Sequence, residues 1–295
     1  MIKNRRYKSR KKRNASLKWL LIGGLFFCLL GGLAYFLIWS PYFWISRIEF
    51  ESGEIPRYYR QDDIKKIIQE ALDKKIWRLV PQKSVFLFSA KNTQSEISER
   101  YPEIKSVQVN KRFPNGLKLA IKERAGVGVW CQLEQRVAAT SSQEEMRVSQ
   151  CFNIDQEGII YRESALVEGG FVLNIFSDKM AEPKIRDKVA SGETMDFILK
   201  LKNELPQIKT AGNAAMADNA AMAANTTLAA VNFKTVSAED LRVKTSADFE
   251  IFFNPSYSIE TQLNALRIVL DNEIKESYAS LEYIDLRIEG RVYYK

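Results

Sequence analysis

The sequence predicts an α+β protein that begins with one transmembrane helix and continues into two domains of mixed strands and helices. Three observations support this fold class. An uncharged apolar run covers residues 19–39, and a strand, helix, helix, strand, strand pattern follows it. Beyond residue 125, patterns typical of strands outnumber those of helices. The part after the apolar run is about 250 residues long, which is enough for two modest domains.

The apolar run is long enough to cross a bilayer. At a rise of about 1.5 Å per residue it spans about 31 Å, against a hydrocarbon layer of roughly 30 Å. It ends in aromatic residues (Trp39, Tyr42, Phe43, Trp44) of the kind that concentrate at membrane interfaces. A cleaved signal peptide has a shorter apolar core that ends in small residues, and a buried core helix rarely lacks polar residues over such a length. We therefore expect an uncleaved anchor over residues 19–39.

A basic tail precedes the anchor. Residues 1–18 contain nine Lys or Arg and no acidic residue, so the positive-inside rule places this tail in the cytoplasm and the rest of the chain outside it. The formal net charge is +8, so the remainder of the chain carries −1. Beside a membrane helix such a tail sets topology and contacts anionic lipid, which makes nucleic acid an unlikely partner.

The composition argues against an enzyme. The chain has no histidine, which removes histidine-based triads and the commonest general base. Acidic pairs have structural explanations: Asp62 and Asp63 stand where a helix needs a cap, and Asp285 alternates with Arg287 along a strand. No phosphate-binding glycine loop or nucleophile elbow is present. We expect no catalytic residue, no metal site and no cofactor.

Two cysteines lie beyond the anchor. Cys131 and Cys151 bracket a polar stretch at 132–150, which is typical of an extended hairpin tip. A disulfide between them would stabilise the fold by about 3 kcal/mol in the chain-entropy model. Two free thiols are equally compatible with the sequence, because spacing does not show that the sulfurs meet.

The first domain, expected at 45–125, is outlined by local signals. Alternation at 47–51 predicts a strand, and Asp62 or Asp63 is expected to cap a helix with one apolar face. Thr93 and Glu96 have the spacing of a capping box for a second helix. Strands then follow around Val107 and around Leu119, joined by a turn at residues 114–116.

Several short motifs stand out between residues 48 and 130. They are Tyr101-Pro102-Glu103-Ile104, Arg112-Phe113-Pro114-Asn115-Gly116 and Ile121-Lys122-Glu123-Arg124. Two more lie near the C-terminus, at Tyr283-Ile284-Asp285-Leu286-Arg287 and Val292-Tyr293-Tyr294. In these motifs the chain resembles the FtsQ/DivIB family of bacterial division proteins. The resemblance implies a POTRA domain with the order β-α-α-β-β, followed by the family's strand-dominated β domain at 126–295.

Patterns in the second domain fit that expectation. Strands are predicted at 152–155 and 158–161 around a turn, and at 171–176, 231–236, 240–245 and 249–253. Helices are predicted at 195–205 and 258–274. Two regions depart from the family pattern: the stretch 132–150, and a low-complexity insertion at 211–230 in which Asn-Ala-Ala-Met-Ala recurs. We expect the latter to be a surface loop.

The resemblance implies a non-enzymatic scaffold at the division septum. It would link bitopic division proteins of the FtsB/DivIC and FtsL types and support septal peptidoglycan synthesis. The chain stops at Lys295 within or just after an expected strand, so a sheet edge is available for strand addition by a partner. The expected partner-binding residues are Ile288, Gly290, Arg291, Val292, Tyr293 and Tyr294. In a purely structural interpretation, Val292 and Tyr294 face the core and Tyr293 is solvated.

Two other functions remain open at this point. An adaptor for envelope secretion or assembly uses the same POTRA fold with other partners. A membrane-anchored wall hydrolase is the third class. In the first domain, Lys111, Arg112, Lys118 and Lys122 are either part of a recruiting hairpin or a solvated face.

Overall fold

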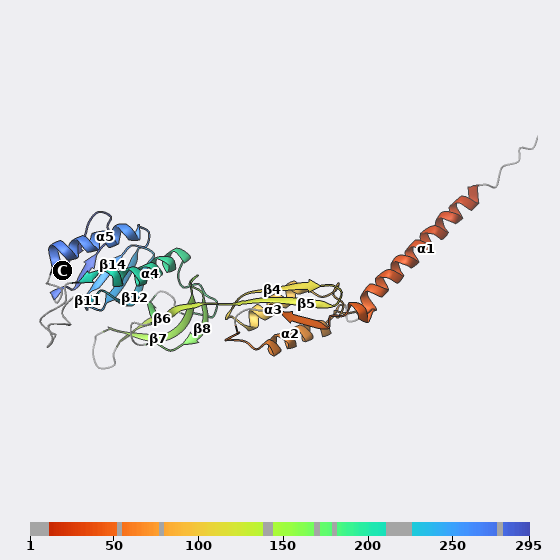
Figure 1. Ribbon diagram of the computed structural model, residues 1–295, viewed down its shortest axis with the longest axis horizontal. Helices are drawn as coiled ribbons and strands as arrows, with labels where there is room; N and C mark the ends of the chain where they lie inside the picture. Colours follow the sequence, from red (N-terminus) through yellow and green to blue (C-terminus); the bar gives the residue numbers. More distant parts are fainter. Residues whose placement is uncertain are drawn as a thin grey trace, which may run out of the picture. The chain divides into compact units, whose positions relative to one another are not determined.

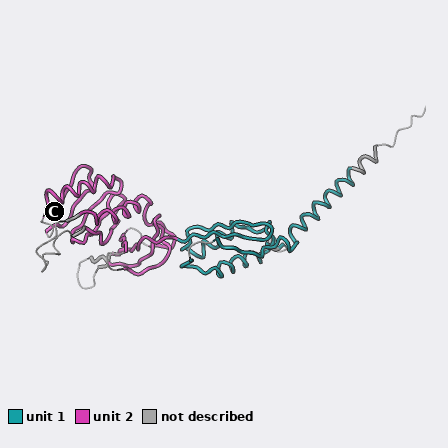
Figure 2. The backbone as a smooth tube through the Cα atoms, viewed as in Figure 1, with its two compact units in different colours: residues 1–123 teal, residues 124–295 magenta. Residues whose placement is uncertain are grey.

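The computed structural model describes residues 12–295 apart from seven gaps, at 52–54, 77–79, 138–143, 168–171, 179–181, 211–225 and 276–279. The chain forms two compact units, residues 1–123 and 124–295, which are coloured separately in Figure 2. The sequence predicted the boundary between the two domains between residues 125 and 126, close to this division.

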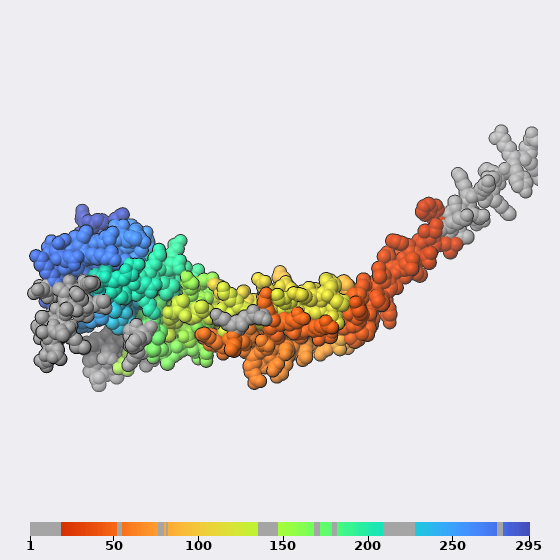
Figure 3. Space-filling view, in the orientation of Figure 1, coloured from red at the N-terminus to blue at the C-terminus, as the bar shows by residue number. Residues whose placement is uncertain are grey.

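The first unit begins with the long helix α1 (Lys12–Trp39). Its segment Trp19–Trp39 is apolar and long enough to cross a membrane, and none of it is buried inside the protein. In the space-filling view the side chains of this segment lie at the surface on the face that is drawn (Figure 3). Among the described residues this is the one helix of that kind, and it lies where the sequence predicts it.

A small α/β sandwich follows α1. Its elements are a turn of 3₁₀ helix η1 (Pro41–Phe43), β1 (Arg47–Phe50), α2 (Gln61–Asp73), the short pair β2 (Lys75–Ile76) and β3 (Val80–Pro81), α3 (Ala90–Arg100), β4 (Ile104–Arg112) and β5 (Gly116–Glu123). The sheet order is β1-β5-β4, with β1 parallel and β4 antiparallel to the central strand β5. Ile64, Ile68, Ile97, Leu117 and Leu119 form the centre of its core. The predicted order of strands and helices is confirmed.

Both helix starts differ from the prediction. Helix α2 begins after Arg60, which makes no side-chain cap, and Asp62 and Asp63 lie in its first turn. There the two carboxylates face the positive end of the helix dipole, so the same residues stabilise the helix from inside it.

Helix α3 begins at Ala90, capped by Ser89, whose Oγ accepts a hydrogen bond from the backbone N–H of Asn92. Thr93 is therefore inside the helix, buried, and its hydroxyl donates to the carbonyl of Ser89 at 3.1 Å. The capping-box prediction was wrong because Ser89 caps the helix one turn earlier, and Glu96 instead pairs with Lys74 and Arg100.

The second unit is built on one sheet of nine strands. These are β6 (Gly126–Val137), β7 (Glu144–Asp155), β8 (Ile160–Ser164), β9 (Leu173–Ser177), β12 (Ala230–Ser237), β13 (Asp240–Thr245), β14 (Glu250–Phe253), β15 (Tyr283–Asp285) and β16 (Tyr293–Tyr294). Their order is β16-β15-β14-β13-β12-β9-β6-β7-β8. Helices α4 (Gly192–Glu204) and α5 (Ile259–Val269) lie over the sheet (Figure 1), and their apolar faces join its core.

Several predicted elements of this unit are confirmed, with shifted ends. Helix α4 starts three residues before the predicted Met195, because Ser191 caps it. Helix α5 has Ser258 as its N-cap and ends at Val269, after which a π-helical turn (Leu270–Ile274) completes the predicted helical span. The turn between β7 and β8 forms around Asp155, whose carboxylate accepts the backbone N–H groups of Glu157 and Ile159.

The predicted surface loop at 211–230 is partly outside the described residues. Its last part was wrongly predicted: Thr226–Thr227 form β11, which pairs with β10 (Lys209–Thr210), Leu228 is buried, and β12 begins at Ala230. Leu228 belongs to the main core of the unit, and this packing holds the end of the segment in place.

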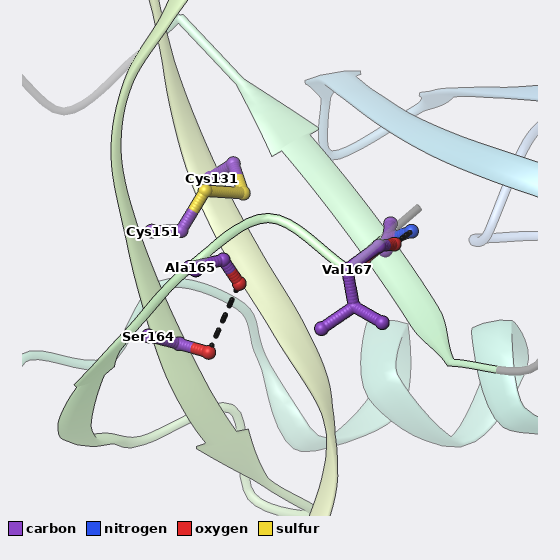
Figure 4. Close-up of a disulfide and its surroundings, with 6 residues drawn as sticks. Cys131, Cys151, Ser164, Ala165 and Val167 are labelled. Carbon is purple, nitrogen blue, oxygen red and sulfur yellow. Dashed lines mark hydrogen bonds between the residues drawn. A yellow bond between two sulfur atoms is a disulfide. The ribbon is translucent and has the colours of Figure 1, made fainter. Parts of the chain in front are cut away.

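Cys131 and Cys151 are joined by a disulfide (Figure 4). They face each other on the antiparallel strands β6 and β7, with Cα atoms 4.1 Å apart. The hairpin register brings the two thiols together, and both cysteines are buried beside Val129 in a small cluster on one face of the sheet. The stretch 132–150 is the outer part of this hairpin, and residues 138–143 at its tip are outside the described residues.

Candidate partner-binding site

The edge strand β16 and the turn before it contain all six predicted contact residues. After β15 the chain makes a turn in which the N–H of Arg291 donates to the carbonyl of Ile288 at 3.1 Å. Gly290 has φ of +73° in that turn, a conformation that glycine adopts without steric cost. The chain then returns as β16, antiparallel to β15. The turn residues thus place Ile288 and Arg291 next to the edge strand.

The backbone of Tyr294 points away from the sheet. The N–H and C=O groups of Lys295 bond with the C=O and N–H groups of Tyr283, at 3.2 and 3.3 Å. Neighbouring residues of an antiparallel strand direct these groups to opposite sides. Tyr294 therefore directs its N–H and C=O to the outer side of β16, where no described strand pairs with it.

Three large side chains at this edge are exposed. Ile288, Tyr293 and Tyr294 expose 51%, 46% and 47% of their surface. Val292 is half-buried and packs against the main core of the unit. The purely structural interpretation is therefore correct for Val292 and Tyr293 but wrong for Tyr294, because a two-residue strand at the edge does not reach far enough over the core to bury it.

A groove adjoins the edge strand. Helix α5 forms one wall and the segment from Leu286 to Arg291 forms the other, and Tyr257, Thr261, Gln262 and Ala265 contribute from the α5 side. Its apolar lining includes Ile288, Leu286 and Ala265. Sequence reasoning missed the α5 contribution. Ala265 is only partly buried against the core. Its position in the helix pattern does not show which distant segment lies opposite it, so the sequence could not indicate the groove.

An ion-pair network lies on the strands next to β16. Arg287 donates to both carboxylate oxygens of Asp285, at 2.9 and 2.6 Å, and to Asp240 at 2.8 Å. Arg242 pairs with the same Asp240, and the guanidinium groups of both arginines lie over the ring of Phe252, at 4.7 and 5.0 Å from its centre. This network links β13, β14 and the end of β15.

The same network shifts two pKa values. Burial pushes the pKa of Asp285 upward, but hydrogen bonds and charge from Arg287 outweigh it, so the pKa is lower than that of an ordinary aspartate. The hydrogen bond to Asp285 in turn raises the pKa of Arg287. Both directions favour the charged forms, so the ion pair between Asp285 and Arg287 persists at neutral pH.

Comparison with known families identifies the first domain. The family model described as "POTRA domain, FtsQ-type" matches residues 56–124. The match confirms the resemblance that the motifs around Tyr101 and Arg112 indicated, and it covers the part of the first unit from just before α2 to the end of β5. No curated protein matches the chain.

Proposed function

We propose that this chain, whose FtsQ-type POTRA domain supports its assignment to the FtsQ/DivIB family, is a non-enzymatic scaffold of the bacterial division machinery. It links other bitopic division proteins and thereby supports septal peptidoglycan synthesis. The expected partners are proteins of the FtsB/DivIC type and the FtsL type. The chain needs no cofactor for this role.

The anchor and the tail support the proposed topology. The apolar segment Trp19–Trp39 fits a single membrane crossing, and the nine basic residues before it favour the cytoplasmic side for the N-terminus. Both folded units then lie outside the cytoplasmic membrane. A disulfide between Cys131 and Cys151 suits that side, because such bonds persist in oxidising compartments.

The observation that carries the scaffold proposal is the outward-facing backbone of Tyr294. A partner segment in extended conformation can add to the sheet by bonding to this N–H and C=O. Backbone pairing gives affinity for any extended chain, so specificity needs side-chain pockets next to the edge. The groove between α5 and Leu286–Arg291 supplies one, and it suits an apolar side chain of the added segment.

Binding of residues 44–295 to the outer segment of the same organism's FtsB/DivIC-like protein tests the proposal. Deletion of residues 291–295 should abolish binding. A sharper variant is Tyr294→Pro, because proline removes the outward N–H and leaves the inward bonds of Lys295 in place. Tyr294→Ala is the matched control, since it removes the ring and keeps the N–H.

The outcomes separate the alternatives. Strand addition predicts that Tyr294→Pro weakens binding at least tenfold more than Tyr294→Ala does. Equal losses would assign the contact to the tyrosine ring and contradict strand addition. Absence of binding by the folded wild-type protein would favour the secretion or assembly adaptor. Concentration of the full chain at the division septum, seen by fluorescence microscopy, distinguishes the division scaffold from that adaptor.

A further inference from the structure

A row of aromatic side chains leads from α1 to the near end of the POTRA domain. The ring centres of Phe36 and Phe43 are 5.9 Å apart, those of Phe43 and Phe86 5.2 Å, and those of Phe86 and Phe113 5.5 Å. Phe36 belongs to α1, Phe43 to η1, Phe86 to the loop after β3, and Phe113 to the turn between β4 and β5. We call these four residues the aromatic row.

Backbone contacts fix the aromatic row to the end of the helix. The hydroxyl of Ser84 donates to the carbonyl of Leu37 at 3.0 Å. The N–H of Val85 donates to the carbonyl of Phe43, and the N–H of Ile45 donates to the carbonyl of Lys83, both at 2.9 Å. Ser84 and Val85 are fully buried. The loop that carries Phe86 is thus hydrogen-bonded to the end of α1 at Leu37 and to the segment just after α1 at Phe43 and Ile45.

The outer part of the row is exposed although its members touch each other. Phe86 exposes 43% and Phe113 65% of its surface. Contiguous exposed aromatic rings are costly in water, and they are favoured at a membrane interface. No described segment of the chain covers them. The row therefore needs an apolar or interfacial neighbour.

The position of the row identifies that neighbour. Phe36 lies three residues before the end of the apolar segment, which corresponds to about 4.5 Å along the helix. The headgroup layer on each side of a bilayer is roughly 5–7 Å thick. Phe43, in contact with Phe36, then lies in or at this layer, and Phe86 lies one ring contact further.

Positive charge accompanies the aromatic rings. Lys111 and Arg112 directly precede Phe113, both are exposed, and neither forms an ion pair with a described residue. Basic side chains beside a membrane surface are attracted by the negative charge of anionic lipid. Two exposed cations that directly precede an exposed aromatic residue in the chain, without an ion pair to a described residue, are thus complementary to a layer of lipid phosphates.

We propose that the near end of the POTRA domain rests in the headgroup layer of the membrane that α1 crosses. Phe86 and Phe113 enter the layer, while Lys111 and Arg112 bind phosphates of anionic lipid. The domain is then held at two places, by the helix and by this surface, which limits how far it tilts. The inference depends on the membrane crossing of α1, which is part of the proposed function.

Depth measurement by spin labelling tests this contact in the full chain. The chain, with Cys28→Ser, is reconstituted in vesicles of phosphatidylcholine with about a quarter phosphatidylglycerol, and a nitroxide is attached to Phe113→Cys. The control is the label at Ser106→Cys, an exposed position nearer the start of β4. A label at Leu29→Cys, within the apolar segment, reports whether α1 spans the bilayer.

The expected ratio of oxygen to nickel-complex accessibility is several-fold higher at 113 than at 106. An equal ratio at both positions, with the label at 29 deep in the bilayer, would overturn the inference and leave the anchor intact. It would also leave the row free for another protein. A label at 29 that remains accessible to the nickel complex would contradict the anchor itself.

The basic pair is tested separately. Replacing phosphatidylglycerol by phosphatidylcholine should move the label at 113 outward, and Lys111→Gln with Arg112→Gln should cause the same shift in the original vesicles. An unchanged depth in both experiments would contradict binding of lipid phosphate by these two side chains.

Discussion

Arg287 donates two parallel hydrogen bonds, of 2.9 and 2.6 Å, to the carboxylate of Asp285, two residues before it in the chain. It donates a third, of 2.8 Å, to Asp240 on β13. Bidentate pairs of this kind are among the stronger polar contacts in proteins. The pair locks the backbone where β15 ends, just before the turn to β16. We therefore expect the edge strand to depend on Arg287 for its position.

Loss of the arginine should destabilise the second unit. Arg287→Met keeps most of the aliphatic length but leaves Asp285 and Asp240 without their shared partner. Because the carboxylates are largely buried, we expect a loss of about 1–3 kcal/mol in the free energy of unfolding. Arg267→Met, on the surface of α5, is the control and should cost less than about 0.5 kcal/mol. Urea denaturation of residues 44–295 measures both, and equal effects would contradict a special role of Arg287.

The lowered pKa of Asp285 predicts a dependence on pH. The pKa in the folded state is below the unfolded value, so the folded state binds the proton less readily than the unfolded chain does. The stabilisation is complete above the ordinary aspartate pKa of about 4 and is lost as pH falls through the lower folded value. Arg287→Met should remove this part of the acid sensitivity. Denaturation midpoints between about pH 7 and about pH 2.5 test it, and parallel curves for both proteins would contradict it.

Gly158 should tolerate no side chain. It has φ of +75°, and a Cβ atom there would lie 2.5 Å from the carbonyl oxygen of Ala190. Strain of the backbone and displacement of Ala190 together predict a loss of about 1–3 kcal/mol for Gly158→Ala. At Gly192, in the first turn of α4, a Cβ meets no described atom within 4 Å. Gly192→Ala should therefore be neutral or stabilising by about 0.5–1 kcal/mol. Thermal melting compares the two variants.

The disulfide should contribute measurably to the second unit. It closes a loop between residues separated by 20 positions, which corresponds to about 3 kcal/mol in the chain-entropy model. Reducing agent should lower the urea midpoint of residues 44–295 but leave that of the variant Cys131→Ser, Cys151→Ser unchanged. Mass spectrometry of unreduced peptides provides the direct check. Detection of free thiols at both positions in protein purified from the envelope would contradict the bond.

Much of the local structure was predictable from periodicity. The apolar segment Trp19–Trp39 needs only length and composition to be recognised, because the bilayer sets the required length. Alternation predicted β13 with its observed ends, and the family motifs around Tyr101 and Arg112 pointed to the domain that the POTRA model matches. Helix starts were less predictable. Ser89 and Thr93 are both good caps, and the packing of α3 on the core decides between them.

By itself, the sequence determined the apolar N-terminal helix, the order of elements in the first domain and the strand character of the second, since these depend on residues close together in the chain. Only the tertiary structure decided that nine strands join in one sheet, that β9 lies parallel between β6 and β12, and that Tyr294 directs its backbone outward. It also brought Phe36, Phe86 and Phe113 into one row. The physical reason is that the periodicity of a segment decides which of its side chains face the core. Which other segment packs against that face depends on how distant parts of the chain fill the shared core together.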